Sequence, residues 1–250
     1  MRKLSAAFLL LAFVNAAPAQ WTAKDVRDEP STDSRVIHRR VDLVDSETGD
    51  HAIVDLALFS TKACKLRVID NQDSTSLEPV VQSSGCLAAV NGGYFDPSFA
   101  PLGLRIIDGK ITSRLVRGPL LTGVVVSDNV TQIFRVGEFP LRRKWNAAVE
   151  CGPFLVDLGR PVRGLESTRE ARRTFVASGS NDRAALGYCP SATLAELAQI
   201  LTSRIGDFKI QRALNLDGGS SSAFWFKREK GVVYYPEQKT VRDFVAIVPK

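Results

Sequence analysis

The sequence is poor in histidine and lacks the common nucleotide-binding loops. Its 250 residues include only two histidines, His38 and His51, both far upstream of the serine-rich stretch 220–222. The segment Gly219-Ser220-Ser221-Ser222-Ala223 is close to the G-x-S-x-G motif that carries the nucleophilic serine of many hydrolases. A serine nucleophile needs a neighbouring base, so a nucleophilic role for this segment has little support. Neither G-x-x-x-x-G-K-[ST] nor G-x-G-x-x-G occurs, which argues against a nucleotide-binding fold.

Long apolar runs are also absent after the N-terminus. Arg2 and Lys3 precede an apolar stretch at 4–14 and the segment Ala17-Pro18-Ala19. This order predicts a signal peptide at 1–19, cleaved after residue 19. An uncleaved anchor is the alternative, but the run is shorter than the ~20 residues that a spanning helix needs. We therefore expect a secreted or periplasmic protein with no membrane span.

The charge pattern shows no nucleic-acid signature. The formal net charge is +6, and +4 after loss of the two charges in the signal peptide. The arginines are scattered, and no basic stripe alternates with aromatic residues. Basic clusters occur at Arg142-Arg143-Lys144 and Arg172-Arg173, where a solvated surface is the simplest interpretation. A mildly basic chain fits an anionic substrate better than nucleic acid.

Four cysteines, an even number, favour disulfides in an exported chain. Three pairings are possible, and we expect Cys64–Cys86 and Cys151–Cys189 because each closes a local loop. Zinc is the competing interpretation. It is weakly supported, because no C-x-x-C occurs and both histidines lie apart from the cysteines.

The remaining chain is rich in strand patterns. We expect a polar, loosely ordered leader at 20–35 and one domain at 36–250, of α+β class, with a strand-rich mixed sheet and few helices. One helix is clear: Thr193 and Glu196 form a capping-box pattern, and the helix should end near residue 204. The expected strands are 36–44, 52–59, 65–69, 87–90, 102–107, 110–113, 124–126, 132–136, 147–149, 154–156, 174–177, 184–188, 212–216, 223–226, 232–235 and 244–248.

Two similar segments stand out within this pattern. Asn91-Gly92-Gly93 and Asn215-Leu216-Asp217-Gly218-Gly219 each follow an apolar run, as expected for a buried strand that enters a tight turn. Paired glycines allow close approach of a ligand to the backbone. The second turn continues as Ser220-Ser221-Ser222 and could form an anion nest, although a plain turn is an equal alternative.

Carboxylate chemistry is a further hypothesis. Asp217 is the best single candidate for an acid or base, since partial burial at the strand end could tune its pKa. Glycosidases usually employ two carboxyl groups, and Glu150 or Asp96 are possible second members. A structural role is the alternative for each. Arg105 and Arg173 are plausible cationic partners for a substrate phosphate.

The order of these motifs resembles the phosphodiester glycosidase family. The matching elements are Asn91-Gly92-Gly93-Tyr94-Phe95, Pro101-Leu102-Gly103-Leu104, Asp108-Gly109-Lys110, Cys151-Gly152-Pro153-Phe154, Arg173-Thr174, and 215–222. The resemblance covers about residues 50–250. It implies hydrolysis of a sugar-1-phosphate diester. We expect no cofactor and no metal, since no EF-hand-like loop occurs; a Ca²⁺ or Mg²⁺ bound through Asp217 and nearby carbonyls is the alternative.

The resemblance also implies where the site lies. Asn91, Gly92 and Gly93 match one wall, Arg173 matches the family's arginine-threonine strand, and the other wall matches Asn215, Asp217, Gly218, Gly219 and Ser221. Two positions depart from the pattern: Ser220 replaces a third glycine, and Phe175-Val176-Ala177 replaces Ala-Ile-Gly. Both changes narrow the space near the backbone. The alternative function is a non-catalytic module that binds envelope phosphoglycans or other anionic glycans.

Overall fold

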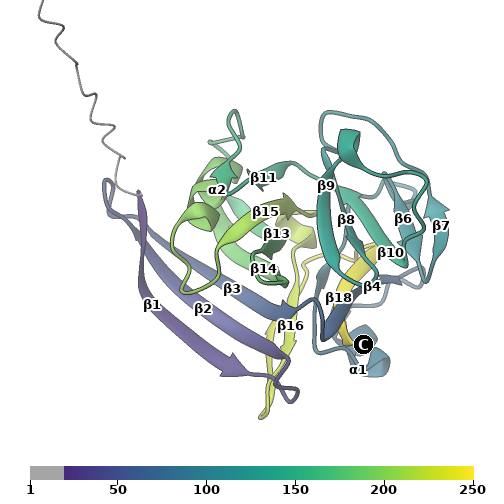
Figure 1. The fold of residues 1–250 in the computed structure, drawn as a ribbon, viewed down its shortest axis with the longest axis horizontal. Helices are drawn as coiled ribbons and strands as arrows, with labels where there is room; N and C mark the ends of the chain where they lie inside the picture. The colour runs from purple at the N-terminus through teal and green to yellow at the C-terminus, as the bar shows by residue number, and fades with distance from the viewer. Residues whose placement is uncertain (1–19) are drawn as a thin grey trace, which may run out of the picture.

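The computed structural model describes residues 20–250, and the expected signal peptide at 1–19 lies outside the described residues. Strands dominate, and they form three sheets with two helices beside them (Figure 1). Every strand pairing between residues 20 and 250 is antiparallel, so the sheets are not of the mixed kind expected. The strand-rich α+β class with few helices is confirmed.

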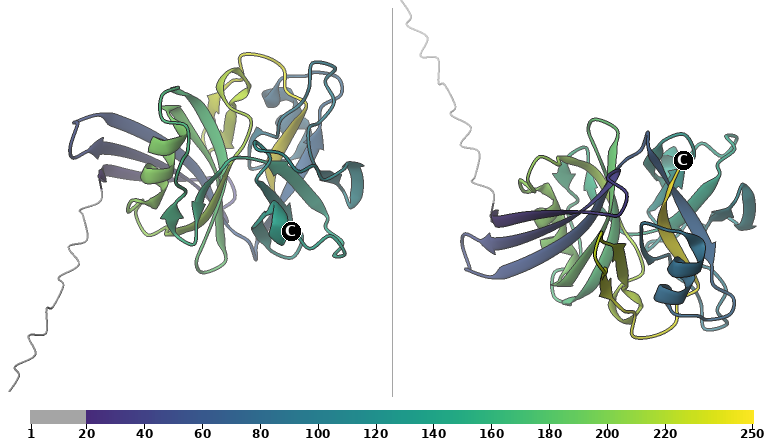
Figure 2. Two further views of the ribbon diagram at one scale, coloured as in Figure 1. Left: turned by 90° about the horizontal axis from the view of Figure 1, so that it is seen from above. Right: turned by 90° about the horizontal axis from the view of Figure 1, so that it is seen from below.

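The largest sheet has eight strands. In spatial order they are β1 (Trp21–Pro30), β2 (Val36–Asp45), β3 (His51–Ser60), β14 (Arg183–Ala192), β13 (Ala171–Gly179), β15 (Ile210–Asn215), β11 (Phe154–Asp157) and β12 (Arg160–Pro161). The curved β1–β2 hairpin extends to one side (Figures 1 and 2), and at its turn Ser31 forms a bridge with Arg228, just after β16.

Strand β1 corrects the prediction of a loosely ordered leader at 20–35. It pairs with β2 along its length, from Trp21 opposite Asp45 to Pro30 opposite Ile37. Only Trp21 at its start is buried, while most of its other residues are exposed or half-buried. An edge strand whose two faces are both exposed to solvent carries polar residues on both faces. Its sequence therefore lacks the alternation of apolar and polar residues by which a half-buried strand is predicted.

Two smaller sheets complete the fold. One contains β7 (Lys110–Ser113), β6 (Arg105–Ile107), β10 (Ala147–Cys151), β8 (Gly123–Ser127) and β9 (Thr131–Arg135), in that order. The other contains β17 (Val232–Tyr235), β16 (Phe224–Lys227), β5 (Ala88–Asn91), β18 (Asp243–Pro249) and β4 (Cys64–Asp70).

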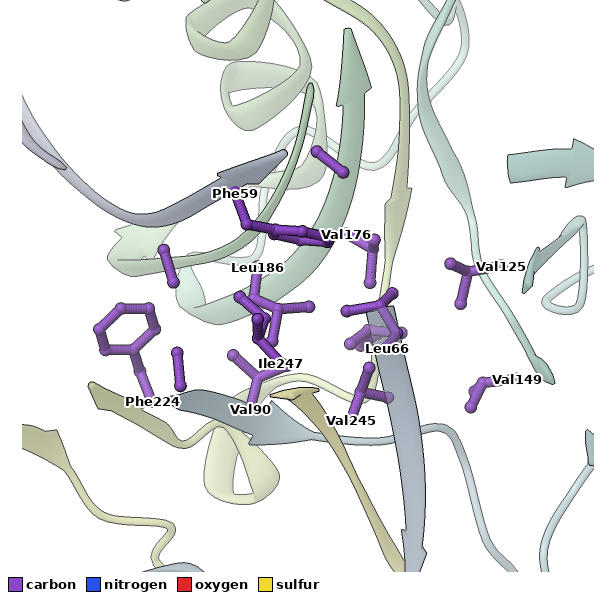
Figure 3. Close-up of a cluster of buried hydrophobic side chains, with 14 of the residues drawn as sticks. Phe59, Leu66, Val90, Val125, Val149, Val176, Leu186, Phe224, Val245 and Ile247 are labelled. Carbon is purple, nitrogen blue, oxygen red and sulfur yellow. The ribbon is translucent and has the colours of Figure 1, made fainter. Parts of the chain in front are cut away.

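One apolar cluster joins all three sheets (Figure 3). Val176 and Leu186 come from the eight-stranded sheet, Val125 from the β8 sheet, and Val90 and Ile247 from the β5 sheet. All five are at most 2% exposed. Because interiors are close-packed, this cluster fixes the ends of β5, β13 and β15 relative to one another.

The helices pack at the periphery. Helix α2 (Leu194–Thr202) has the expected capping box between Thr193 and Glu196, and it buries Leu197 and Leu201 against the eight-stranded sheet. Helix α1 (Leu77–Ser84) was not expected from the sequence. It has only eight residues and two buried side chains, which is too short for a clear helical period. No helix in the described part is long and apolar enough to cross a membrane.

The cysteines correct another prediction. All four are buried free thiols, so neither Cys64–Cys86 nor Cys151–Cys189 is bridged in the structure. The loop-closure argument assumed that neighbours in sequence meet in space. Instead Cys151 ends β10 and Cys189 lies in β14, which belong to different sheets. Burial raises the pKa of Cys151 and of Cys189 to about 12, which keeps both protonated at neutral pH.

Candidate active site

The two Gly-Gly segments meet at Asn91. Its Nδ2 donates to the carbonyl of Asp217 at 2.7 Å, and its Oδ1 accepts from the Thr174 hydroxyl at 2.8 Å and from the Ala223 amide at 3.1 Å. The Asp217 amide in turn donates to the Gly92 carbonyl. Asn91 is fully buried. It therefore holds β5, β13 and the turn after β15 together, and its polar atoms are occupied by the protein itself.

The first turn is filled by a buried ion pair. Arg105 Nε donates to Asp243 Oδ2 at 2.8 Å, and the Gly93 amide donates to Asp243 Oδ1. A Cβ at Gly92 would overlap the Asp243 carboxylate, and one at Gly93 would overlap the Arg105 guanidinium. The glycines thus admit two protein side chains, in the space where the sequence suggested a ligand.

Arg105 has no role in this arrangement as a phosphate ligand. It is 0% exposed, and beyond its pair with Asp243 it donates to the carbonyls of Tyr94, Leu104 and Glu150. All these partners are internal. The substrate-binding role predicted for Arg105 is replaced by a structural one, because its guanidinium satisfies backbone carbonyls that would otherwise be buried without donors.

Glu150 also lies away from the site. Its Oε2 accepts from the amides of Leu104 at 2.7 Å and Val116 at 3.0 Å. Alternation along β10 points Glu150 and Cys151 to opposite faces, and Cys151 is the one on the side of Tyr94 and Asp217. The pKa of the Glu150 carboxyl is raised above its ordinary value because the side chain is buried, although the two amide donors act in the opposite direction. The structure places Glu150 as a tether for the segments around 104 and 116.

Asp96 is likewise occupied locally. Its Oδ1 accepts from the amides of Ser98 and Ala100 and from the Ser98 hydroxyl, within an exposed turn. These donors lower the pKa of its carboxyl. Asp96 therefore closes its own turn.

Arg173 reaches the second turn. It is 8% exposed and is oriented by two carbonyls: Nε donates to Ala192 at 3.0 Å and Nη2 to Arg169 at 2.8 Å. Its Nη1 would lie 3.5 Å from a Cβ at Gly218, so this end of the guanidinium faces the glycine. Burial lowers the pKa of Arg173, and Glu166, whose carboxylate lies 3.8 Å from Nη2, raises it.

Asp217 lies at the end of β15, beside Gly218. It is partly exposed, in contrast to Asn91. Burial raises the pKa of its carboxyl above the ordinary range, while the Ser221 hydroxyl, Lys239 and the Gly218 amide act in the lowering direction. A carboxyl with a raised pKa, next in sequence to a glycine that a buried cation faces, is suited to proton transfer.

The turn after Asp217 is open. It continues into the 3-10 turn η2 (Gly219–Ser221), where Gly219 has a φ of +67° and no heavy atom within 4 Å of an added Cβ. Ser220 accepts from the amides of Gln238 at 2.7 Å and Lys239 at 3.2 Å through its carbonyl. The loop around 238 is therefore attached to the turn and brings Lys239 to Asp217.

Asn215 and Tyr94 share an acceptor on the far side of Asp217. Asn215 Nδ2 donates to the Gly152 carbonyl at 3.0 Å, and the Tyr94 hydroxyl donates to the same oxygen at 2.6 Å. The Gly152–Pro153 peptide is cis. Burial raises the pKa of Tyr94, which keeps it protonated. Tyr94 remains partly exposed, so its hydroxyl lies at the border between the interior and the site.

Four contributors were not singled out from the sequence. These residues contact or approach the two turns, and they are Tyr94, Thr174, Asp243 and Lys239. Tyr94 and Thr174 stand directly after the motifs Asn91-Gly92-Gly93 and Arg173, so adjacency could have identified them. Asp243 and Lys239 carry no such signal, because only the pairing of β18 with β5 brings their segment to the site.

Larger hollows of the described surface lie elsewhere. One of about 420 Å³ is lined by Ile133, Ser178 and Arg212, toward the other ends of β13 and β15. Within residues 20–250, neither Arg173 nor Asp217 nor Gly218 lines one of these larger hollows. No group of three or more histidine, cysteine or acidic side chains suited to a metal occurs within residues 20–250.

Comparisons with known proteins show which family and fold this chain resembles. A family model described as phosphodiester glycosidase matches residues 84–248, which includes both Gly-Gly turns and Arg173. No curated protein gives a significant sequence match.

Solved structures share the fold at low sequence identity. A hypothetical protein from Synechocystis has a TM-score of 0.68 at 15% identity over 91% of this chain, and this chain spans 64% of that one. The zebrafish N-acetylglucosamine-1-phosphodiester alpha-N-acetylglucosaminidase catalytic domain, auto-inhibited by its pro-peptide, has a TM-score of 0.57 at 16% identity, covering 94% of this chain and 85% of that one. An exported protein from Burkholderia pseudomallei has a TM-score of 0.53 at 12% identity, with coverages of 82% and 75%.

Proposed function

This chain belongs to the phosphodiester glycosidase family, and from that premise we propose that it hydrolyses sugar-1-phosphate diesters. The products are the free sugar and a phosphomonoester. One observation carries the proposal: Asp217, with its raised pKa, lies beside a glycine toward which the buried cation Arg173 is directed. Substrate phosphate and proton donor would then meet at Gly218.

Arg173 binds the phosphodiester in this proposal. Its Nε and Nη2 are held by carbonyls, which leaves Nη1 directed at Gly218. A guanidinium held in this way loses little freedom when it binds an oxyanion, and charge-assisted bonds of this kind are strong. Lys239, which approaches Asp217 from the exposed side, supplies a second positive charge near the same anion.

Asp217 acts as the general acid. The bond between the anomeric carbon and the bridging oxygen breaks, the electron pair stays on that oxygen, and Asp217 gives it a proton. Water adds to the anomeric carbon, and the proton it releases restores the acid. A phosphate is already a good leaving group, so the acid contributes less than in an ordinary glycosidase. The carboxyl must start protonated, which its raised pKa favours.

Asn215 and Tyr94 support this geometry without taking part in bond breaking. Both donate to the Gly152 carbonyl, which fixes the backbone on the far side of Asp217. Asn91 holds the Asp217 carbonyl in the same way, and Thr174 in turn donates to Asn91. The acid is therefore fixed at the backbone on two sides.

We further propose that the protein acts outside the cytoplasm. The support is the signal-peptide pattern of residues 1–19 together with the exported Burkholderia protein among its structural neighbours.

The test is Asp217→Asn on a panel of methyl diesters of sugar 1-phosphates. We expect kcat to fall about 100- to 10,000-fold, the range for loss of general acid catalysis, with thermal unfolding unchanged or shifted upward. Released sugar and phosphomonoester are quantified separately by NMR. Asp96→Asn is the matched control, since it removes a carboxylate of the same type near the first turn, and it should leave kcat unchanged.

Two outcomes contradict the proposal. Near-full kcat in Asp217→Asn removes Asp217 from the mechanism. Saturable binding of diesters or phosphoglycans by the wild type, with no product over long incubation, favours the alternative of a non-catalytic binding module.

A further inference from the structure

Exposed apolar side chains concentrate on one segment beside the candidate site. Nine large hydrophobic residues are exposed in the described chain, and four lie within residues 102–120: Leu102, Ile111, Val116 and Leu120, which are 43–66% exposed. Single exposed apolar residues are ordinary, but a local group marks an interaction surface. β7, which carries Ile111, is the outermost strand of its sheet and lies at the edge of the molecule (Figure 1).

The distal part of this segment carries charge of one sign, while the one acidic residue of 102–120, Asp108, pairs with Arg67. Residues 110–120 contain Lys110, Arg114 and Arg117 and no acidic residue. All three basic residues are exposed, and none of them forms an ion pair with a described residue. Apolar tips surrounded by unpaired cations match an anionic lipid surface, where head groups attract the cations and the acyl boundary receives the apolar groups.

The segment is anchored so that these side chains remain outside. The Val116 amide donates to the buried Glu150 carboxylate at 3.0 Å, and Leu115 packs on the apolar cluster of the β8 sheet. At the other end the Thr122 amide donates to the Cys151 carbonyl at 3.0 Å. Val116 and Leu120 are thus held outward between two fixed points.

This segment also lies next to the site. A Cβ at Gly152 would overlap the Leu120 carbonyl, so the two backbones touch there. The Gly152 carbonyl is the acceptor shared by Tyr94 and Asn215. On the opposite flank, the Leu102 amide donates to the Tyr94 carbonyl at 2.8 Å. A surface that covered these apolar side chains would therefore border the site.

We propose that residues 102–120 dock the protein on an anionic lipid bilayer, with Val116 and Leu120 entering the head-group region and Arg114 and Arg117 binding lipid phosphates. The docked orientation places the site at the membrane surface, where it meets lipid-borne sugar-phosphate esters. The docking itself does not depend on the proposed hydrolysis, whereas the orientation toward substrate rests on it.

The experiment is co-sedimentation of the full chain with vesicles. Vesicles of phosphatidylcholine alone are compared with vesicles that contain phosphatidylglycerol, at low and high salt. We expect binding to the anionic vesicles only, weakened by salt. The double variant Val116→Ser/Leu120→Ser should lower the partition coefficient about tenfold, and Arg114→Gln/Arg117→Gln about 30-fold.

Matched controls separate this surface from general charge and hydrophobicity. Leu158→Ser removes a side chain that is 74% exposed in the turn between β11 and β12, and Lys227→Gln/Lys230→Gln removes two exposed charges from the β16–β17 hairpin of another sheet. Both should bind as the wild type does. Asp217→Asn should also bind fully. Vesicle binding by the wild type with no turnover of diesters would overturn the hydrolase proposal alone.

Three results would overturn the docking proposal. They are equal sedimentation with neutral and anionic vesicles, wild-type binding by both double variants, and a dimer in gel filtration that Leu120→Asp dissociates. The last result would assign the surface to a second copy of the chain.

Discussion

The two Gly-Gly turns look alike in sequence and differ in what occupies them. At Gly92-Gly93 the space left by the missing side chains is filled by Asp243 and Arg105, which are 2% and 0% exposed. At Gly218-Gly219 nothing lies within 4 Å of an added Cβ on Gly219, and only ordinary contacts surround one on Gly218. One turn binds the protein's own ion pair, and the other is open to a ligand.

The difference shows that glycine pairs report close approach without saying what approaches. The first turn needs glycine because a carboxylate and a guanidinium of the same chain lie against its backbone. The second turn needs glycine at Gly219, where φ is positive, whereas a Cβ on Gly218 would meet only ordinary contacts. A chemical site requires vacant space, so only the second turn qualifies.

The largest expected effect is on the closed turn. In Gly92→Ala the new Cβ overlaps the Asp243 carboxylate and must displace it from Arg105. Breaking a buried pair leaves an uncompensated charge, so we expect a loss of about 3–5 kcal/mol in the free energy of unfolding, measured in urea. Gly137→Ala is the control, since an added Cβ there meets nothing within 4 Å. Equal stability of the two variants would contradict the closed-turn description.

Arg173→Lys tests the open turn. Lysine keeps the charge but cannot satisfy both the Ala192 and Arg169 carbonyls while facing Gly218. We expect kcat/KM for a sugar-1-phosphate diester to fall about 10- to 100-fold, in line with loss of a charge-assisted hydrogen bond. Arg183→Lys, in β14 at the protein surface, should leave kcat/KM unchanged. If the loss of kcat/KM in Arg173→Lys is fully explained by a smaller folded fraction, the assignment of Arg173 as the phosphate ligand is contradicted.

The raised pKa of Asp217, at the open turn, makes the stability of the protein depend on pH. Its pKa is raised in the folded state, so its contribution to stability is full below the unfolded pKa and is lost as pH rises through the folded pKa. Asp217→Asn removes this loss. The variant should therefore gain stability over the wild type as pH increases, and the two should converge in acid. Urea unfolding from pH 3 to 8 measures this, and a constant difference would exclude a raised pKa.

The smallest expected effect is at Gly219. Alanine there must adopt a φ of +67° in empty space, which costs about 1 kcal/mol of backbone strain. Gly231→Ala has the same kind of φ and free space away from the site, so it should cost the same in thermal unfolding. Only Gly219→Ala should also raise KM for the diester. A KM effect of equal size in both variants would show that strain alone is responsible.

Much of the secondary structure could be predicted because its signals are local. The Thr193–Glu196 capping box marks the start of α2, and the Asp108-Gly109 hairpin joins β6 and β7 as expected, with positive φ at both residues. Two elements were missed because their own sequences carry no clear signal. Strand β1 is polar on both faces, and α1 is too short to show a period. The cysteine pairing failed because it depends on which sheets lie side by side.

The candidate site divides in the same way. By itself the sequence determined most of the strands, though not their ends, together with the two Gly-Gly turns and the motif order that identifies the family. Only the tertiary structure decided that the Asn91 side chain hydrogen-bonds Thr174 and Asp217. It also decided that Arg105 pairs with Asp243, 138 residues away. Within β10 it decided that Glu150 points to the opposite face from Cys151. The physical reason is that occupancy depends on contacts between distant segments. A residue type and its neighbours determine which bonds a side chain can make, and the packing of three sheets determines which of those bonds the protein has already made.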